Sequence, residues 1–126
     1  MKNKKGLILS LLLIMSMICS YFIYPKNFAT DGGSCYQGIT LMIHRMFLII
    51  CGSTTILSLV ILFFKPKLSL ILSIVSTVIW LLWCFGAIVD SFISLIYLFP
   101  VLFLSILNIV SMIKYNRSEQ HNSNEL

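Results

Sequence analysis

The chain has 126 residues and a formal net charge of +5, and 59% of its residues are hydrophobic while only 10% are charged. Because soluble domains are about one quarter charged, this composition excludes a soluble globular protein and predicts an integral membrane protein whose partner is the lipid bilayer. The basic residues cluster at the ends of apolar runs and form no basic stripe with interleaved aromatic residues. We therefore expect no nucleic-acid partner.

Four apolar runs follow one another along the chain, and each is long enough to cross a hydrocarbon core of about 30 Å as a helix. The last two are separated by Asp90 alone. As a single helix they would extend about 69 Å, so the chain must turn at Asp90 and Ser91, one of which would cap the fourth helix. Pro66 is predicted to end the second helix and open the third. The predicted helices cover about residues 7–24, 39–64, 68–89 and 91–113.

The distribution of basic residues predicts the orientation of these helices. Lysine and arginine next to membrane-spanning helices lie mainly on the cytoplasmic side, which places both chain ends in the cytoplasm. The sequence thus predicts an all-α membrane protein, with four transmembrane helices in an antiparallel bundle, N-in and C-in, as one domain over residues 1–115. A polar, disordered cytoplasmic tail is expected at residues 116–126. The flanking basic residues are Lys2, Lys4, Lys5, Lys65, Lys67, Lys114 and Arg117.

The first apolar run is predicted to remain in the membrane as an uncleaved anchor. It continues through Tyr21, Phe22, Ile23 and Tyr24 without a clear small-x-small cleavage site. A cleaved signal peptide is the alternative, because MKNKK followed by a leucine-rich stretch has the required charge and apolar core. The richness in lysine and isoleucine favours a bacterial source, so we expect a multi-pass protein of the cytoplasmic (inner) membrane.

Each apolar run carries a stripe of small and polar residues at helical spacing. Helices in lipid associate through small residues and hydrogen bonds between helices, so these stripes are predicted to face one another inside a compact bundle. A polar pathway through the bundle is the alternative interpretation. The stripes are Gly6, Ser10, Met17 and Ser20; His44, Cys51, Thr55 and Ser58; Ser69, Ser73, Thr77, Trp80, Cys84 and Ala87; and Ser94, Tyr97, Ser105 and Asn108.

The candidate functional or ion-pairing residues are His44, Arg45, Asp90 and Asn108. A charged side chain at the centre of a membrane helix is costly, so Arg45 is expected at the outer boundary. There it either extends to the lipid headgroups, pairs with Asp90 or Asp31, or recognises a ligand. Asp90 is interpreted first as a corner residue. Asn108 lies at depth and needs a hydrogen-bonding partner, because an unpaired amide in hydrocarbon is costly.

The cysteines Cys19, Cys35, Cys51 and Cys84 have no C-x-x-C spacing, so the sequence predicts neither a metal site nor a thioredoxin-like redox motif, and no cofactor is expected. Cys35 falls in the expected outer loop. A disulfide from Cys35 to Cys19 or to Cys84 is one interpretation, since disulfides persist in oxidising compartments. Buried thiols that act as small hydrophobic side chains are the other.

Enzyme function is not expected, because the sequence offers no Ser-His-Asp set, metal cluster, phosphate-binding loop or carboxylate pair. We expect a small polytopic membrane protein without catalytic machinery that acts through contacts between helices or with a protein partner. It would be an accessory subunit, a regulator, or an immunity protein against a membrane toxin. The alternative is a small homo-oligomeric channel or transporter, in which hydroxyl groups line the path.

Overall fold

The computed structural model describes residues 4–23, 33–90 and 95–125, without the side chains of residues 33–37, 88–90 and 95. The described residues form four α-helices, each long and apolar enough to cross a membrane. The predicted all-α bundle of four membrane-spanning helices is therefore confirmed. The helices are α1 (Lys4–Ile23), α2 (Gly33–Leu62), α3 (Pro66–Asp90) and α4 (Leu95–Asn124).

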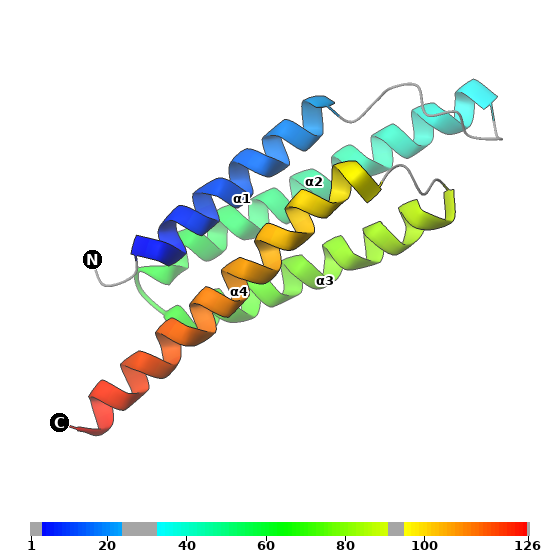
Figure 1. The fold of residues 1–126 in the computed structure, drawn as a ribbon. Coiled ribbons are helices and arrows are strands. Elements are labelled where there is room, and N and C mark those ends of the chain that lie inside the picture. Colours follow the sequence, from blue (N-terminus) through cyan, green and yellow to red (C-terminus); the bar gives the residue numbers. More distant parts are fainter. Residues whose placement is uncertain (1–3, 24–32, 91–94, 126) are drawn as a thin grey trace.

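The helices form an antiparallel ring in which each contacts its neighbours in the chain and α4 returns to contact α1 (Figure 1). The pairs in contact are α1–α2, α2–α3, α3–α4 and α4–α1. Figure 1 places the start of α1 and the end of α4 at the same end of the bundle, as an even number of crossings requires. We refer to this as the terminal end of the bundle, and to the other as the far end.

The connection between α2 and α3 is short and defined by a proline. α2 ends at Leu62 and α3 begins at Pro66, which has no amide to lose in the first helical turn. The amide of Lys65 donates to the carbonyl of Ile61 at 2.7 Å, and the amide of Ser69 donates to the carbonyl of Lys65 at 3.1 Å. The role predicted for Pro66 is confirmed, and the tight turn holds α2 and α3 as one hairpin.

At the far end the helix boundaries differ from those expected. α2 begins at Gly33 instead of about residue 39, so Cys35 belongs to the first turn of a helix and not to a loop. α4 begins at Leu95 instead of residue 91, so Asp90 is the last residue of α3 and lies five positions before the first residue of α4. The sequence-based prediction divided residues 68–113 at the midpoint and so assigned almost every residue to a helix. A connection between antiparallel helices usually needs about two to eight residues.

The C-terminal segment also differs from the expected disordered tail at residues 116–126. α4 continues as a helix to Asn124. Two pairs with four-residue spacing lie near its end: the Tyr115 hydroxyl donates to Glu119 at 2.6 Å, and His121 lies 3.3 Å from Glu125, the residue that follows α4. Such pairs stabilise exposed helices, and the sequence after Pro100 contains no glycine or proline to interrupt α4. The polar composition indicates solvation of this segment but does not prevent helix formation.

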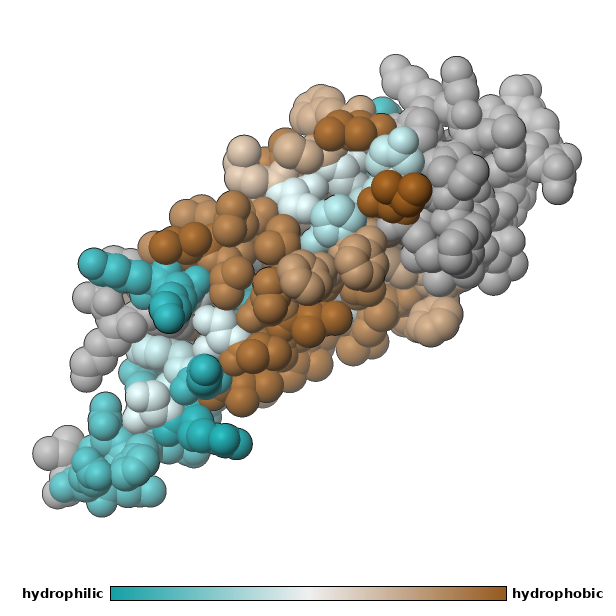
Figure 2. Space-filling view, in the orientation of Figure 1, coloured by the Kyte–Doolittle hydropathy of each residue, from teal (hydrophilic) through white to brown (hydrophobic). Residues whose placement is uncertain are grey.

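Large apolar side chains cover the middle of the molecule, and polar residues gather at the terminal end (Figure 2). The apolar band is formed by exposed leucine, isoleucine, valine and phenylalanine side chains from all four helices, as expected for surfaces that face lipid. The described basic residues at the terminal end are exposed: Lys4, Lys5, Lys65, Lys67, Lys114 and Arg117.

Candidate functional site

The predicted polar stripes face the interior of the bundle. Every stripe residue with a described side chain is buried, except Tyr97, which is half-buried. Ser94 lies outside the described residues. The structure therefore confirms the helix faces that the sequence indicated, and their contacts divide into a histidine cluster toward the far end, a hydroxyl zipper between α2 and α3, and one amide contact between α1 and α4.

The histidine cluster consists of Ser20 on α1, His44 on α2, and Trp80 and Trp83 on α3. His44 is fully buried, at 0% exposure. The indole Nε1 of Trp83 donates to Nδ1 of His44 at 3.0 Å, and the Oγ of Ser20 lies 3.5 Å from Nε2. Because an indole nitrogen only donates, Nδ1 must be unprotonated, so the ring proton of the neutral imidazole is on Nε2 and faces Ser20. His44 thereby connects three helices.

Trp80 extends the histidine cluster to the fourth helix. Its Nε1 donates to the backbone carbonyl of Leu98 at 3.4 Å, and both residues are completely buried. The ring centroid of His44 lies 6.0 Å from that of Trp80, and Phe47 stacks on Trp83 at 5.1 Å. Buried tryptophan needs an acceptor for its N–H group, and here each indole finds one on a different helix. All four helices thus meet at the histidine cluster.

The hydroxyl zipper joins α2 to α3 along the rest of the bundle. Its part nearest the terminal end is a serine cluster of Ser58, Ser69 and Ser73, which is completed by Met112 from α4. The Oγ of Ser58 lies 2.9 Å from that of Ser69 and 2.8 Å from that of Ser73. Ser69 also donates to the backbone carbonyl of Ser58 at 2.7 Å, and Ser73 donates to the sulfur of Met112 at 3.3 Å. These hydroxyl groups use one another as partners.

Nearer the middle of the bundle, the hydroxyl zipper continues with Cys51, Thr55 and Ser76. The Ser76 hydroxyl donates to the carbonyl of Cys51 at 3.3 Å, and the thiol of Cys51 donates to the carbonyl of Ser76 at 3.6 Å. The Thr55 hydroxyl donates to the Cys51 carbonyl at 2.7 Å and lies 3.5 Å from the Ser76 hydroxyl. The small side chains allow the two backbones to approach closely, as membrane helix pairs require.

Asn108 on α4 has the partner that its depth in the membrane requires. Ser10 of α1 donates its hydroxyl proton to Oδ1 of Asn108 at 3.2 Å, and each residue is 1% exposed. This contact spans 98 positions of sequence and joins the first helix to the last. The sequence predicted that Asn108 needs a partner but did not indicate which stripe would supply it.

Arg45 follows His44 in the sequence, but its side chain points in another direction and makes a different contact. Successive helix residues point about 100° apart, so a buried His44 turns Arg45 toward the α1 side of α2. Its guanidinium carbon lies 5.0 Å from the ring centroid of Tyr21 on α1, within cation–π range. Its Nε is buried and has no hydrogen-bond partner in the described part of the chain. The side chains of Asp31 and Asp90 are not described, so the expected ion pair stays a prediction.

The described cysteines Cys19, Cys51 and Cys84 are free thiols, the first exposed and the other two buried. The side chain of Cys35 is not described, and its pairing with Cys19 or Cys84 therefore stays a prediction. Among the described residues no three histidine, cysteine or acidic side chains gather where they could hold a metal ion.

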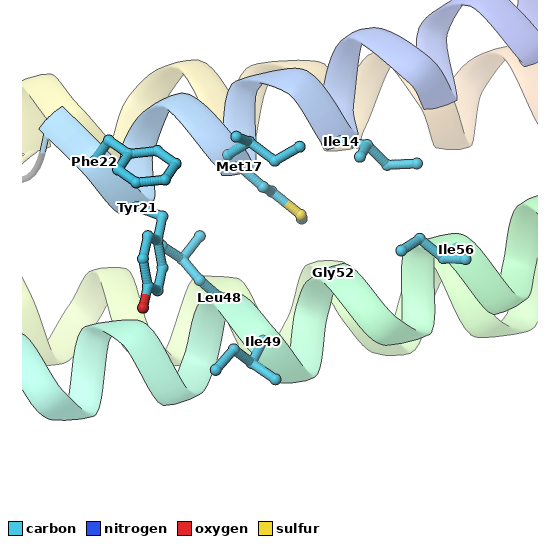
Figure 3. Close-up of a pocket in the computed structure, with 9 residues that line it drawn as sticks. Ile14, Met17, Tyr21, Phe22, Leu48, Ile49, Gly52 and Ile56 are labelled. Atoms are coloured by element: carbon cyan, nitrogen blue, oxygen red, sulfur yellow. The ribbon is translucent and has the colours of Figure 1, made fainter.

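An apolar groove, which the sequence did not indicate, lies between α1 and α2 on the lipid-facing surface (Figure 3). Its volume is about 240 Å³. Gly52 forms part of its floor, and a Cβ atom built on Gly52 would meet no atom within 4 Å. Tyr21 lines one end of the groove, and its ring is the one that the guanidinium of Arg45 contacts. The complete lining is Ile14, Met17, Ile18, Tyr21, Phe22, Leu48, Ile49, Gly52 and Ile56.

Comparison of the chain with protein-family models, with curated proteins and with solved structures finds no match.

Proposed function

We propose that this protein is a non-catalytic, multi-pass membrane protein that acts by contacting a protein partner within the membrane. It would serve as an accessory subunit, a regulator or a toxin-immunity protein. One observation carries this proposal: the polar groups of the interior are bonded to one another across the helices. What the bundle offers to other molecules within the membrane is its apolar outer surface, which is the surface that a membrane-embedded partner would meet.

The geometry of Ser20 and His44 disfavours a catalytic role for this pair. A hydroxyl 3.5 Å from an imidazole nitrogen resembles a nucleophile and its general base. A base must present an unprotonated nitrogen to the hydroxyl, and here Trp83 occupies Nδ1 as a donor, which leaves the proton on Nε2 beside Ser20. In a catalytic arrangement the third group would accept a proton from the imidazole. The tautomer that Trp83 imposes suits a structural histidine.

The contacts of the serine cluster disfavour a channel through one chain. A hydrated path needs hydroxyl groups that are free to bind water or ions, whereas those of Ser58, Ser69 and Ser73 are paired with one another. Fully buried Trp80 and Leu98 fill the interior closer to the far end. A homo-oligomeric channel would therefore need its path between chains.

The distribution of basic residues supports placing the terminal end in the cytoplasm, as the positive-inside rule requires. The protein is proposed to reside in the cytoplasmic membrane of a bacterium, on the evidence of its residue usage and its four spans.

Site-specific photocrosslinking in native membranes tests the proposal. A photoreactive residue is placed singly at lipid-facing Leu11, Ile50, Ile74 and Phe103, one position on each helix. We expect one or two adjacent helices to give an adduct with a distinct protein and the other helices to give none. Purified protein in liposomes should conduct no ions. Crosslinks only to other copies of this chain, together with ion flux in the liposomes, would instead establish the channel.

A further inference from the structure

The groove between α1 and α2 has the shape and polarity of a site for a single hydrocarbon chain. Its lining is almost entirely apolar, and it opens on the surface that faces lipid. Its volume of about 240 Å³ is below the range of about 300 to 1,000 Å³ typical of sites that enclose whole small molecules. Exposed Ile18 and Ile49 form its walls, one on each helix, while Gly52 leaves space at its floor.

The end of the groove near Tyr21 carries a cation with unused hydrogen-bonding capacity. The guanidinium of Arg45 lies over the Tyr21 ring, and its Nε is buried without a hydrogen-bond partner among the described residues. A buried donor on a charged group is costly to leave unmatched. Arginine presents a planar set of donors that suits phosphate oxygens, so the chemistry that complements this end of the groove is a phosphate monoanion.

The Arg45 guanidinium and the apolar groove follow one another in the same order as the phosphate and the acyl chain of a phospholipid. Tyr21 lies close to the end of α1 at Ile23, where tyrosine is favoured at the level of lipid headgroups. From Tyr21 to Ile14, which also lines the groove, α1 advances about 10 Å toward the middle of the membrane. From Arg45 to Gly52, α2 covers about the same distance. With Tyr21 at the level of the headgroups, the groove follows the direction of an acyl chain.

We propose that an anionic phospholipid binds here, with its phosphate at Arg45 and one acyl chain in the groove between Tyr21 and Gly52. A phospholipid satisfies both features at once, because it joins a negative charge to a flexible apolar chain. An apolar partner helix would fill the groove and leave the Nε of Arg45 without a hydrogen-bond acceptor. This site goes beyond the proposed function and does not depend on it, since the lipid would bind whether or not a protein partner is present.

Native mass spectrometry of the full chain in detergent tests the site. The protein is mixed with phosphatidylglycerol, with phosphatidylcholine of the same chain length, or with inorganic phosphate. Both lipids carry the phosphate, but the choline group of phosphatidylcholine adds a positive charge that offsets the phosphate and opposes Arg45. We therefore expect a one-to-one adduct that favours phosphatidylglycerol by about ten- to a hundredfold, the range of a charge-assisted hydrogen bond. Equal binding of both lipids would overturn the role of Arg45, and equal retention of phosphate alone would show an anion site without an acyl chain.

Two variants separate the parts of the site, and two others serve as controls. Arg45→Gln should remove the preference for phosphatidylglycerol. Gly52→Leu should reduce binding of either lipid, because Gly52 lines the groove and a Cβ at this position meets nothing within 4 Å, so the new side chain would take up groove space. Gly86→Leu on α3 is its control, since a Cβ there also meets nothing within 4 Å, and Lys65→Gln is the control for the loss of an exposed cation.

Both controls should bind as the unmodified chain does. Binding unchanged in Gly52→Leu would show that the acyl chain lies elsewhere. A dimer that forms in place of the lipid adduct and is lost in Gly52→Leu would show that a second copy occupies the groove. The preference of the unmodified chain for one headgroup keeps the proposal testable even if a variant fails to fold.

Discussion

The indole nitrogen of Trp83 lies 3.0 Å from Nδ1 of His44, so a tryptophan on α3 determines which nitrogen of a buried histidine on α2 carries the proton. That histidine then presents its proton to Ser20 on α1. The Trp83–His44 pair therefore holds three helices in register by a polar contact where the surrounding lipid offers no hydrophobic driving force for association.

The coupling between His44 and Trp83 can be measured by a double-mutant cycle. We expect the free energies of unfolding of His44→Leu, Trp83→Phe and the double variant to give a coupling of about 0.6 to 1.7 kcal/mol, the range for hydrogen bonds between membrane helices. Unfolding in mixed micelles with increasing SDS provides the measurement. The cycle of His44→Leu with Trp80→Phe is the control, because Trp80 contacts the same ring without a hydrogen bond to it, and its coupling should be smaller. Equal couplings would contradict the assignment.

The serine cluster predicts that residue size matters more at Ser69 than at an exposed serine. Ser69 is completely buried between α2 and α3, so Ser69→Leu should separate the helices and lower the free energy of unfolding by about 1 to 3 kcal/mol. Ser53→Leu is the matched control, because Ser53 is exposed on the lipid side of α2, and it should change stability by less than about 0.5 kcal/mol. Similar losses in both variants would argue against the packing described.

Cysteine crosslinking should confirm the register of α2 against α3. The hydroxyl oxygens of Ser58 and Ser73 are 2.8 Å apart, so cysteines at these two positions, in a chain without its own cysteines, should form a disulfide on mild oxidation. Protection from alkylation, reversed by a reductant, reports the bond. The pair Ser53→Cys and Ser73→Cys should form none, since Ser53 faces lipid. A disulfide in the control pair and none in the first would require a different register.

Removal of the Asn108 amide should loosen α1 from α4. Asn108→Leu leaves the buried Ser10 hydroxyl without its acceptor, and we expect a loss of about 1 kcal/mol in the free energy of unfolding. The double variant Ser10→Ala with Asn108→Leu should have a free energy of unfolding no lower than that of Asn108→Leu alone, because the unmatched Ser10 hydroxyl is then absent. A further loss of about 1 kcal/mol in the combined variant would indicate that the two residues act independently.

The orientation of the bundle predicts the compartments of its two ends. A reporter fused after Asp90, the last residue of α3, should lie outside the cytoplasm, and one fused at the C-terminus should lie inside it. Paired alkaline phosphatase and green fluorescent protein fusions read the two compartments with opposite activities. Signals from one compartment at both positions would overturn the topology and the placement of Arg45 among the lipid headgroups.

Helix number and buried faces could be predicted from the sequence because both depend on local properties. The lengths of the apolar runs, compared with the thickness of a membrane, predict the four spans. The helical spacing of small and polar residues predicts the buried faces on which His44, Thr77 and Asn108 lie. The pairing of those faces depends on how the helices are arranged in space, so the sequence did not identify Trp83 as the partner of His44 or Ser10 as the partner of Asn108.

The groove and the helical extension after residue 115 were not predicted, each for a physical reason. The groove arises where Gly52 on α2 faces Met17 and Ile18 on α1, and a single glycine in an apolar run gives no periodic signal. The extension is helical without apolar periodicity, because it continues a helix that has already begun and pairs such as Tyr115 with Glu119 add to its stability. Composition indicated correctly that this segment is polar, but polarity alone does not decide backbone conformation.

The contact of α1 with α4 constrains how the protein is made. α2 and α3 can associate as soon as both have left the ribosome, since only residues 63–65 separate them. Ser10, by contrast, must wait until Asn108, 98 positions later, has been synthesised and inserted. Until then its hydroxyl and the indole of Trp80 lack their final acceptors. The nascent chain therefore presents unmatched polar groups to the insertion machinery or to a membrane chaperone, and it completes its ring only after the last helix arrives.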